Sequence, residues 1–317
     1  MTAVTLIRTT YAIFAILVLS LSTNYVASAT PHSPYRGWDY LVGRLRDIGV
    51  NEQDINHIYQ NPRMPRFTFV PFSVQPRESS SIYTNFNRNS FLLLGANFIR
   101  ENKTLFDDIE KKLHVPPETI VAILVIESRI GKNTGHELVA YRLSRLASVC
   151  APDNLAHNYK LQRKKDRSIT FEAVQERGRY LETTFLPEIP ALLEIGKRNN
   201  VPVLKVTGSS AGAFGLPQFL PSAFLRFGVD GDKNGHVSLY SPVDAAWSAA
   251  NYLAGYGYRA DLSLAERRSI IWRYNKSEAY IDAVLALSAG IRKEVDSPSP
   301  QPSKLPNKPS ALKQPAS

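Results

Sequence analysis

The chain has 317 residues, 44% of them hydrophobic, and a formal net charge of +10 at pH 7. This length accommodates one large domain or two smaller ones, and the apolar content is sufficient for a buried core. The single cysteine, Cys150, excludes an intramolecular disulfide and a cysteine-based metal site, and we expect it to be a buried apolar thiol. The positive charge favours anionic partners, namely nucleic acid, a membrane surface or an anionic cell-wall polymer.

Residues 1–29 have the pattern of a secretory signal peptide. Arg8 precedes an apolar run over 11–21, and the sequence ASA at 27–29 is a cleavage signal. The alternative is a single membrane anchor, but the run is short for a span of ~20 residues. No cysteine follows the run, which argues against a lipoprotein anchor. We therefore predict a periplasmic or exported protein cleaved after Ala29, for which nucleic acid is the least favoured partner.

Helical spacing of apolar residues predicts one mainly α domain over residues 35–294, with few strands. The first helical stretch breaks at Gly49, the proline-interrupted residues 63–76 are expected to be extended, and the basic segment KLQRKKDRS (160–168) is expected to be a loop. The predicted helical segments are 38–61, 87–114, 115–131, 137–149, 171–199, 243–255, 264–275 and 277–292.

The end of the chain differs in composition from the rest. Over residues 295–317 proline, serine and lysine dominate, and aromatic residues are absent. Such a segment cannot bury enough apolar surface to fold, so we predict a disordered basic tail. Its charge suits a role in holding the protein near an anionic wall.

The segment VPPETIVAILVIESRIG (115–131) is typical of a helix that is apolar on nearly every side until it reaches Glu127. Ile123 and Leu124 lie one turn earlier, and such surroundings disfavour the charged carboxylate and raise its pKa. A carboxylic acid that keeps its proton near neutral pH suits the cleavage of a glycosidic bond, where the leaving oxygen needs a proton. The alternative is a glutamate at a helix end that pairs with Arg129 or Lys132.

The segment TGSSAGAFGLPQFLPSAF (207–224) is rich in small residues that precede Gln218. Small residues allow a close approach of backbone, as on the floor of a groove. The side chain of Gln218 offers a donor and an acceptor, as a sugar hydroxyl or acetamide requires. No lysine and hydroxyl pair follows the glycines, so the segment is not a phosphate loop. The alternative is a tight loop that connects two helices.

The segment VDGDKNGHVSLYSPVD (229–244) fits the start of a calcium-binding loop. Asp230, Asp232 and Asn234 have the D-x-D-x-N spacing before a glycine, and the backbone carbonyl of His236 falls at the next ligand position. The closing glutamate of the standard loop is absent, but Asp244 follows three residues later and is suited to close a longer loop. The alternative is a solvated turn.

The last segment whose residues suit ligand binding is RYNKSEAYIDAV, in which Tyr274 and Asn275 precede an apolar helix. A tyrosine beside an asparagine suits a wall that stacks on a ligand and hydrogen-bonds to it. The alternative is a core tyrosine followed by a capping asparagine.

Together these segments, in this order and at compatible spacing, resemble the lytic murein transglycosylase B family over roughly residues 35–294. The resemblance implies a lysozyme-like helical fold with a groove for peptidoglycan strands, and it implies Glu127 as the single catalytic acid. It further implies that the glycan is held by Ser209, Gln218, Tyr252, Tyr274 and Asn275. It also implies a structural Ca²⁺ held by Asp230, Asp232, Asn234, His236 and Asp244, and no cofactor for catalysis.

The same resemblance implies a non-hydrolytic reaction. Glu127 would act first as acid and then as base, and the product would be a 1,6-anhydro-N-acetylmuramic acid end. We expect a monomer that acts on peptidoglycan, with other cell-wall enzymes as further partners. Two alternatives stay open, a non-catalytic peptidoglycan-binding protein and a hydrolytic muramidase.

Four features depart from the family pattern. Residues 126–128 are Ile-Glu-Ser where Val-Glu-Thr is usual, Ser210 replaces an aromatic residue, and Asn102 stands where a substrate-facing tyrosine is expected. Only about 20 residues separate Tyr252 from Tyr274, which predicts a compact chain without an inserted subdomain. These changes bear on subsite preference more than on chemistry.

Overall fold

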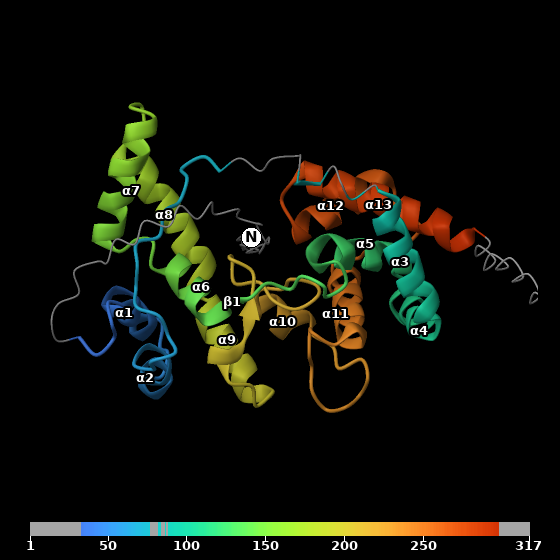
Figure 1. The fold of residues 1–317 in the computed structure, drawn as a ribbon, viewed down its shortest axis with the longest axis horizontal. Helices are drawn as coiled ribbons and strands as arrows, with labels where there is room; N and C mark the ends of the chain where they lie inside the picture. The colour runs from blue at the N-terminus through green and yellow to red at the C-terminus, as the bar shows by residue number, and fades with distance from the viewer. Residues whose placement is uncertain (1–32, 77–81, 84–85, 87, 298–317) are drawn as a thin grey trace, which may run out of the picture.

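The computed structural model describes residues 33–76, 82–83, 86 and 88–297 (Figure 1). The predicted signal peptide 1–29 and nearly all of the tail 295–317 lie outside these residues, and both stay predictions. The described chain is mainly helical, as the apolar spacing predicted. Its named strands, β1 (Glu137–Leu138) and β2 (Thr207–Gly208), have two residues each. Within the described ranges, no helix has the length and apolar composition that crossing a membrane requires.

The helices largely follow the predicted segments. In chain order they are α1 (Asp39–Asp47), α2 (Glu52–Tyr59), α3 (Asn89–Glu101), α4 (Lys103–Leu113), α5 (Pro117–Ser128), α6 (Val139–Ala147), α7 (Pro152–Lys165), α8 (Phe171–Phe185), α9 (Glu188–Arg198), α10 (Pro221–Phe227), α11 (Pro242–Gly255), α12 (Leu264–Tyr274) and α13 (Glu278–Asp296), with a short 3-10 helix, η2 (Val203–Lys205).

Three predicted helical segments are divided. The first divides at Gly49, as expected, where φ is +80°. Residues 87–114 divide at Asn102, which leaves helical geometry with φ −119° and ψ 35°. Residues 171–199 divide before Pro187, which has no N–H with which to continue the helical hydrogen bonds.

The expectation of a basic loop at 160–168 was wrong for most of its length. Helix α7 begins with Pro152 in its first turn and continues to Lys165, so only 166–168 belong to the turn. Lysine, arginine, glutamine and leucine are good helix formers, and the tertiary packing of the preceding turns extends the helix through them.

Helix α5 occupies the centre of one half of the molecule, surrounded by α3, α4, α11 and α13 (Figure 1). Eight of its twelve residues are buried, which explains why its sequence is apolar on nearly every side. Pro117 stands at its first position, where a missing N–H has no cost. The other half contains α6, α8 and α9, which pack on one another, and α7, which packs on α8.

The two halves meet at the short antiparallel ladder β1–β2, in which Glu137 lies opposite Gly208. Strand β1 follows the turn after α5, and β2 begins the glycine-rich segment that leads to α10. Helix α10 packs on α9 from one half and on α11 from the other. The ladder therefore fixes the glycine-rich segment relative to the end of α5.

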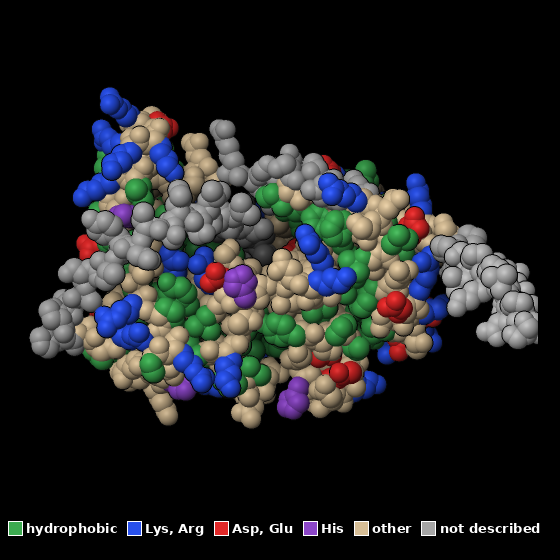
Figure 2. All heavy atoms as spheres, viewed as in Figure 1, with side chains coloured by type: hydrophobic (Ala, Val, Ile, Leu, Met, Phe, Trp, Pro, Cys, Tyr) green, Lys and Arg blue, Asp and Glu red, His purple; other side chains and the backbone are tan. Residues whose placement is uncertain are grey.

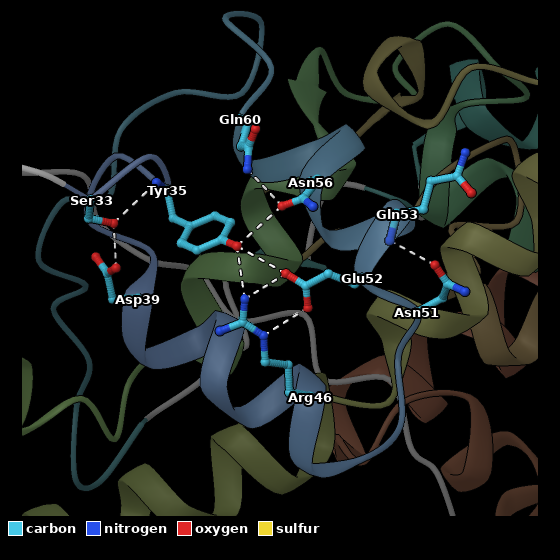
Figure 3. Close-up of polar contacts among 9 residues, drawn as sticks. All are labelled: Ser33, Tyr35, Asp39, Arg46, Asn51, Glu52, Gln53, Asn56 and Gln60. Atoms are coloured by element: carbon cyan, nitrogen blue, oxygen red, sulfur yellow. Dashed lines mark hydrogen bonds and ion pairs between the residues drawn. The ribbon is translucent and has the colours of Figure 1, made fainter.

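A polar cluster fixes the start of the described chain to α1 and α2 (Figure 3). Arg46 donates to the Tyr35 hydroxyl at 2.8 Å and to both Glu52 carboxylate oxygens at 2.6 and 2.9 Å. Tyr35 in turn donates to Asn56 at 3.2 Å. The Arg46 hydrogen bonds lower the pKa of Glu52 to about 2. The cluster is exposed, so we expect it to orient these helices more than to stabilise them.

Cys150 is partly buried beside Glu182, which ties α8 to α1. Tyr40 and Arg44 donate to the Glu182 carboxylate at 2.6 and 2.8 Å. Burial, and then the charge of Glu182, raises the pKa of Cys150 to about 12. The thiol therefore keeps its proton near neutral pH, which fits a packing role and argues against a nucleophile.

Candidate active site

Glu127 lies in the last turn of α5, half-buried, and its carboxyl oxygen Oε1 accepts a hydrogen bond from the Tyr280 hydroxyl at 2.7 Å. Tyr280 is in the first turn of α13, where its N–H is capped by Ser277, and it is 1% exposed. Burial, and then the Glu127 charge, raises the pKa of Tyr280 well above its ordinary value. The hydroxyl therefore stays protonated and serves Glu127 as a donor.

The chain after Glu127 makes an unusual turn. Arg129, Ile130 and Gly131 have successive φ values of +53°, +56° and +83°. The left-handed region is uncommon for a β-branched residue, so Ile130 is strained at a cost of ~1–3 kcal/mol. The buried Ser128 hydroxyl donates to the Leu124 carbonyl at 3.2 Å and accepts the Gly131 N–H at 3.0 Å, which locks the turn. This strain is concentrated directly beside the candidate acid.

The turn brings residues 134–135 against the glycine-rich segment. The Gln218 amide donates to the Thr134 carbonyl at 3.1 Å and to the Gly215 carbonyl at 2.8 Å. A Cβ on Gly135, where φ is +84°, would lie 2.1 Å from the Gly208 carbonyl oxygen. The predicted close backbone approach is therefore present, and it links the end of α5 to the segment that carries Gln218.

Ser209 and Gln218 border this junction. Ser209 is half-buried, and its hydroxyl accepts the Ala213 N–H at 3.2 Å. Gln218 is 7% exposed and has φ +51°. Both protons of its amide nitrogen go to backbone carbonyls, so the side chain keeps its oxygen as the group available to a ligand. The sequence had indicated that Gln218 could offer a ligand both a donor and an acceptor. In the structure the donor is used within the protein, and the acceptor oxygen is what Gln218 can offer.

Tyr252 and Tyr274 form a buried aromatic layer behind Tyr280. They are 2% and 0% exposed, and their hydroxyls donate to the Arg273 and Pro217 carbonyls, each at 2.6 Å. The Tyr274 ring stacks on that of Tyr280 with centroids 6.3 Å apart and lies 4.8 Å from that of Tyr252. Tyr274 is thus a core tyrosine, the alternative to an exposed stacking wall, because its hydroxyl and ring are fully used inside the protein.

Asn275 is the C-cap of α12 and is 4% exposed. Its N–H donates to the Ile271 carbonyl at 3.2 Å, so its backbone ends the helix. Two of the four departures from the family pattern, Ser210 and Asn102, make backbone-linked contacts within the protein. The Ser210 carbonyl accepts from Arg142 at 2.7 Å, and the Asn102 amide donates to the Phe98 carbonyl at 2.9 Å.

Sequence reasoning missed Tyr280. It is one of 15 tyrosines and is followed by apolar residues at helical spacing, a pattern typical of a core position. The signal that was available is Ser277, an N-cap residue that places Tyr280 in the first turn of α13. Nothing in the local sequence indicates that this turn lies against Glu127.

The candidate calcium loop brings its acidic residues together. Oxygen atoms of Asp230, Asp232 and Asp244 all lie within 4.8 Å of one another. Asp244 is fully buried and accepts the Gly231 and Ser238 N–H groups at 2.9 and 2.8 Å. No ion pair between described residues joins a Lys or Arg to any of the three. Three carboxylates that converge without a cationic side chain fit a hard cation such as Ca²⁺.

The other predicted ligands lie at the exposed tip of the same loop. The Asn234 side chain accepts the His236 N–H at 2.9 Å, and both residues are exposed. The Asn234 N–H lies 3.1 Å from an oxygen of Asp230 and from one of Asp232, which folds the tip over the carboxylates. The loop is joined to the glycine-rich segment by the Leu216 N–H, which donates to the Leu239 carbonyl at 2.8 Å.

The sequence profile of a family described as the transglycosylase SLT domain matches residues 37–270. The chain belongs to this family. The match contains Glu127, the glycine-rich segment and the whole of the candidate calcium loop. Among curated proteins, the chain is 33% identical over 144 residues to the membrane-bound lytic murein transglycosylase B of Escherichia coli K12. That alignment covers 45% of this chain and 32% of the relative, so it spans about a third of the relative's length.

Several solved structures have a fold similar to that of this chain. The soluble lytic transglycosylase SltB1 of Pseudomonas aeruginosa has a TM-score of 0.58 and 22% identity, covering 81% of this chain and 98% of that one. The Escherichia coli lytic transglycosylase SLT35 in complex with calcium has a TM-score of 0.60 and 18% identity, covering 90% and 97%. SltB3 of Pseudomonas aeruginosa in complex with NAG-NAM-pentapeptide has a TM-score of 0.56 and 19% identity, covering 80% and 78%. The SLT-domain chain therefore has the predicted lysozyme-like, mainly α fold.

Proposed function

We propose that the protein is a lytic transglycosylase that cleaves the β-1,4 bond between N-acetylmuramic acid and N-acetylglucosamine in peptidoglycan. The observation that carries the proposal is the placement of Glu127. It stands at the half-buried end of the central helix, with one carboxyl oxygen held by Tyr280, in a chain of the SLT-domain family. Peptidoglycan fragments are bound by the Pseudomonas aeruginosa SltB3 of similar fold, which supports the choice of substrate.

The proposed chemistry uses Glu127 twice. In its protonated form Glu127 gives its proton to the glycosidic oxygen. The bond from that oxygen to the muramic C1 breaks, and positive charge develops at C1. The resulting Glu127 carboxylate then takes the proton of the C6 hydroxyl, whose oxygen bonds to C1. The product is a 1,6-anhydro end, no water is consumed, and Glu127 regains its proton.

A single carboxylate is consistent with the electrostatics of the site. Glu127 is the acidic group whose charge raises the pKa of both Tyr274 and Tyr280. A two-carboxylate hydrolysis would need a second acid within about 5–10 Å. The buried rings of Tyr252 and Tyr274 would hold Tyr280 in place by packing. Asn275 would fix the end of α12, next to Tyr274.

The substrate would be held above the junction of α5 with the glycine-rich segment. Ser209 and the side-chain oxygen of Gln218 are the groups that we assign to the glycan. Ca²⁺, held by Asp230, Asp232 and Asp244 with Asn234 and the His236 carbonyl, would stiffen the loop that hydrogen-bonds to Leu216. Its role would be structural. We place the protein in the periplasm or outside the cell, as a monomer that acts on peptidoglycan beside other cell-wall enzymes.

The test is mass spectrometry of products from purified peptidoglycan digested with the signal-free protein and with Glu127→Gln. We expect anhydromuropeptides from the parent, and a loss of about 10²–10⁴-fold in the variant with peptidoglycan binding retained. Reducing-end products would mean that water attacks, as in a hydrolytic muramidase. An absence of products from a correctly folded parent would instead indicate a peptidoglycan-binding protein.

A further inference from the structure

Helices α7 and α8, with the turn between them, form a hairpin that projects from the body of the protein at the upper left of Figure 1. We call residues 152–185 the arm and residues 159–173 its tip. Every residue of the tip is exposed or half-buried, so the tip contributes no buried side chain to the core. Neither the fold nor the candidate active site accounts for this projection.

The tip is strongly basic. It contains two acidic residues, Asp166 and Glu172, and five basic residues, Lys160, Arg163, Lys164, Lys165 and Arg167. None of the five basic residues forms an ion pair with an acidic residue that the structure describes. Asp166 is instead engaged by the Ser168 N–H and hydroxyl, at 2.9 and 2.6 Å. Figure 2 shows the blue side chains gathered at this projection.

Apolar side chains are interleaved with these charges. Leu161 and Phe171 are 37% and 38% exposed in the tip, and Tyr180 is 41% exposed further along α8. The Phe171 ring packs edge-on against that of Tyr159 at 5.6 Å, which joins the two helices beneath the charged end. Long basic side chains beside exposed aromatic rings are the combination found where proteins meet the interface of a lipid bilayer.

The base of the arm is held firmly. Buried Asn154 and Asn158 of α7 accept the N–H groups of Val70 and Phe72, at 2.7 and 2.9 Å, and Asn158 also donates to the Val70 carbonyl at 2.9 Å. Within the extended segment 63–76, which was predicted from its prolines, residues 70–72 are therefore held along one side of α7. The arm projects as a fixed element, so its tip can touch a flat surface while the body stays clear.

We propose that the tip of the arm docks on the surface of an anionic phospholipid bilayer. Unpaired basic residues near such a surface are attracted by its negative potential. The tip has no buried polar group around which a small anion could be enclosed, so a dispersed array of headgroups fits it better than one phosphate or peptide carboxylate. The inference draws on the proposed export of the chain, and it does not depend on the proposed cleavage reaction.

The test is co-sedimentation of the full signal-free protein with vesicles of phosphatidylcholine, with and without phosphatidylglycerol, at physiological salt. The variant replaces Lys160, Lys164 and Lys165 with glutamine, which keeps the helical propensity of α7. Its matched control replaces three exposed lysines elsewhere, Lys111, Lys205 and Lys293, and so carries the same net charge. Circular dichroism and the unfolding temperature establish that each variant is folded.

We expect the parent to bind the anionic vesicles alone, the tip variant to bind them at least tenfold more weakly, and the control to stay within about threefold of the parent. Phe171→Ser should weaken binding as well, since the ring would enter the interface. Equal losses in the tip variant and the control would overturn the proposal, because net charge alone would then explain binding. The proposal would also be overturned if the tip variant bound anionic vesicles as tightly as the parent. The same holds if the variant lost binding to purified peptidoglycan and kept its binding to vesicles. Peptidoglycan cleavage by the tip variant should be unchanged, which separates this inference from the proposed function.

Discussion

At the scale of single residues, the pair of Glu127 and Tyr280 decides what the site can do. A tyrosine with a strongly raised pKa is a donor at any pH at which the enzyme works, and it restricts the rotation of the carboxyl group that it holds. The locked turn at Ser128 restrains the backbone of the same acid from the other side. The acid is therefore oriented before any substrate arrives, as proton transfer in a transition state requires.

Tyr280→Phe should lower kcat by about 10–100-fold and leave KM nearly unchanged. A hydrogen bond to a charged group contributes ~1.5–3 kcal/mol, and each 1.4 kcal/mol is about a factor of ten. Steady-state cleavage of a soluble peptidoglycan fragment measures both constants. Tyr59→Phe is the matched control, because Tyr59 is also fully buried and its hydroxyl lies 2.9 Å from that of Ser144. A Tyr280→Phe enzyme with the parent kcat would remove Tyr280 from its positioning role.

At the scale of elements, the site depends on a backbone contact between the chain after α5 and the glycine-rich segment. Gly135 meets Gly208 so closely that no side chain fits between them. The same contact places the Thr134 carbonyl where Gln218 donates to it. The end of helix α5 and the glycine-rich segment are thus held together, although neither sequence predicts that these two segments meet.

Gly135→Ala should destabilise the protein by more than about 1 kcal/mol and lower turnover, because it combines backbone strain with a collision against the Gly208 carbonyl. Gly257→Ala separates the two effects. Gly257 has φ +85° but nothing within 4 Å of an added Cβ, so strain alone applies there. Urea unfolding and cleavage rates measure both variants, and equal losses of stability and turnover would contradict the importance of the close contact.

A second element contact predicts a dependence of stability on pH. Glu188, in the first turn of α9, is fully buried and accepts the N–H and hydroxyl of Ser222 in α10 at 2.8 and 2.6 Å. Burial raises the pKa of Glu188 above its ordinary 4.5, and the Ser222 hydrogen bonds offset part of the rise. The folded state therefore binds this proton more tightly than the unfolded state.

The free energy of unfolding should accordingly fall as the pH rises from about 4.5 through the raised pKa of folded Glu188, and level off above it. Glu188→Gln should remove this part of the decline, because its side chain keeps an acceptor for Ser222 and has no proton to lose. Chemical unfolding between pH 4 and 8, in roughly half-unit steps, measures the difference. Parallel curves for parent and variant would contradict the assignment of the decline to Glu188.

At the scale of the whole molecule, the candidate calcium loop connects parts that lie far apart in the chain. Asp244 stands in the first turn of α11, and α11 packs on both α4 and α5. The opposite side of the loop, at Leu239, holds the backbone of Leu216 beside Gln218. A cation between these two sides would therefore stabilise the segment that carries Gln218 as well as the loop.

Ca²⁺ at a hundredfold excess over its Kd should raise the unfolding temperature by about 5–10 °C, and a chelator should reverse the rise. Asp244→Asn should abolish the effect, while Asp108→Asn, an exposed residue outside the loop, should not. Differential scanning fluorimetry measures all three proteins. If the unfolding temperature of the parent does not change when Ca²⁺ is added, the proposed calcium site is contradicted.

The sequence by itself determined those features that depend on near neighbours. Apolar spacing located most of the helices, though not α7 or α10, because burial of one face repeats with the helical period. The apolar surroundings of Glu127 and the acidic spacing at 230–234 could be recognised because both depend only on residues that are close in the sequence. The small residues at 207–215 correctly predicted a close backbone approach, since only they leave room for it.

Only the tertiary structure decided which groups meet and which are exposed. The Tyr280 hydroxyl and Glu127 are 153 positions apart, and no local pattern selects one of 15 tyrosines as the donor. The burial of Tyr274 and the loss of donors from Gln218 depend on the carbonyls of Pro217 and Thr134, which the fold places beside them. The helix through Lys160–Lys165 depends likewise on the packing of the turns before it. Long-range contacts are set by how helices pack, and that information is spread over the whole chain.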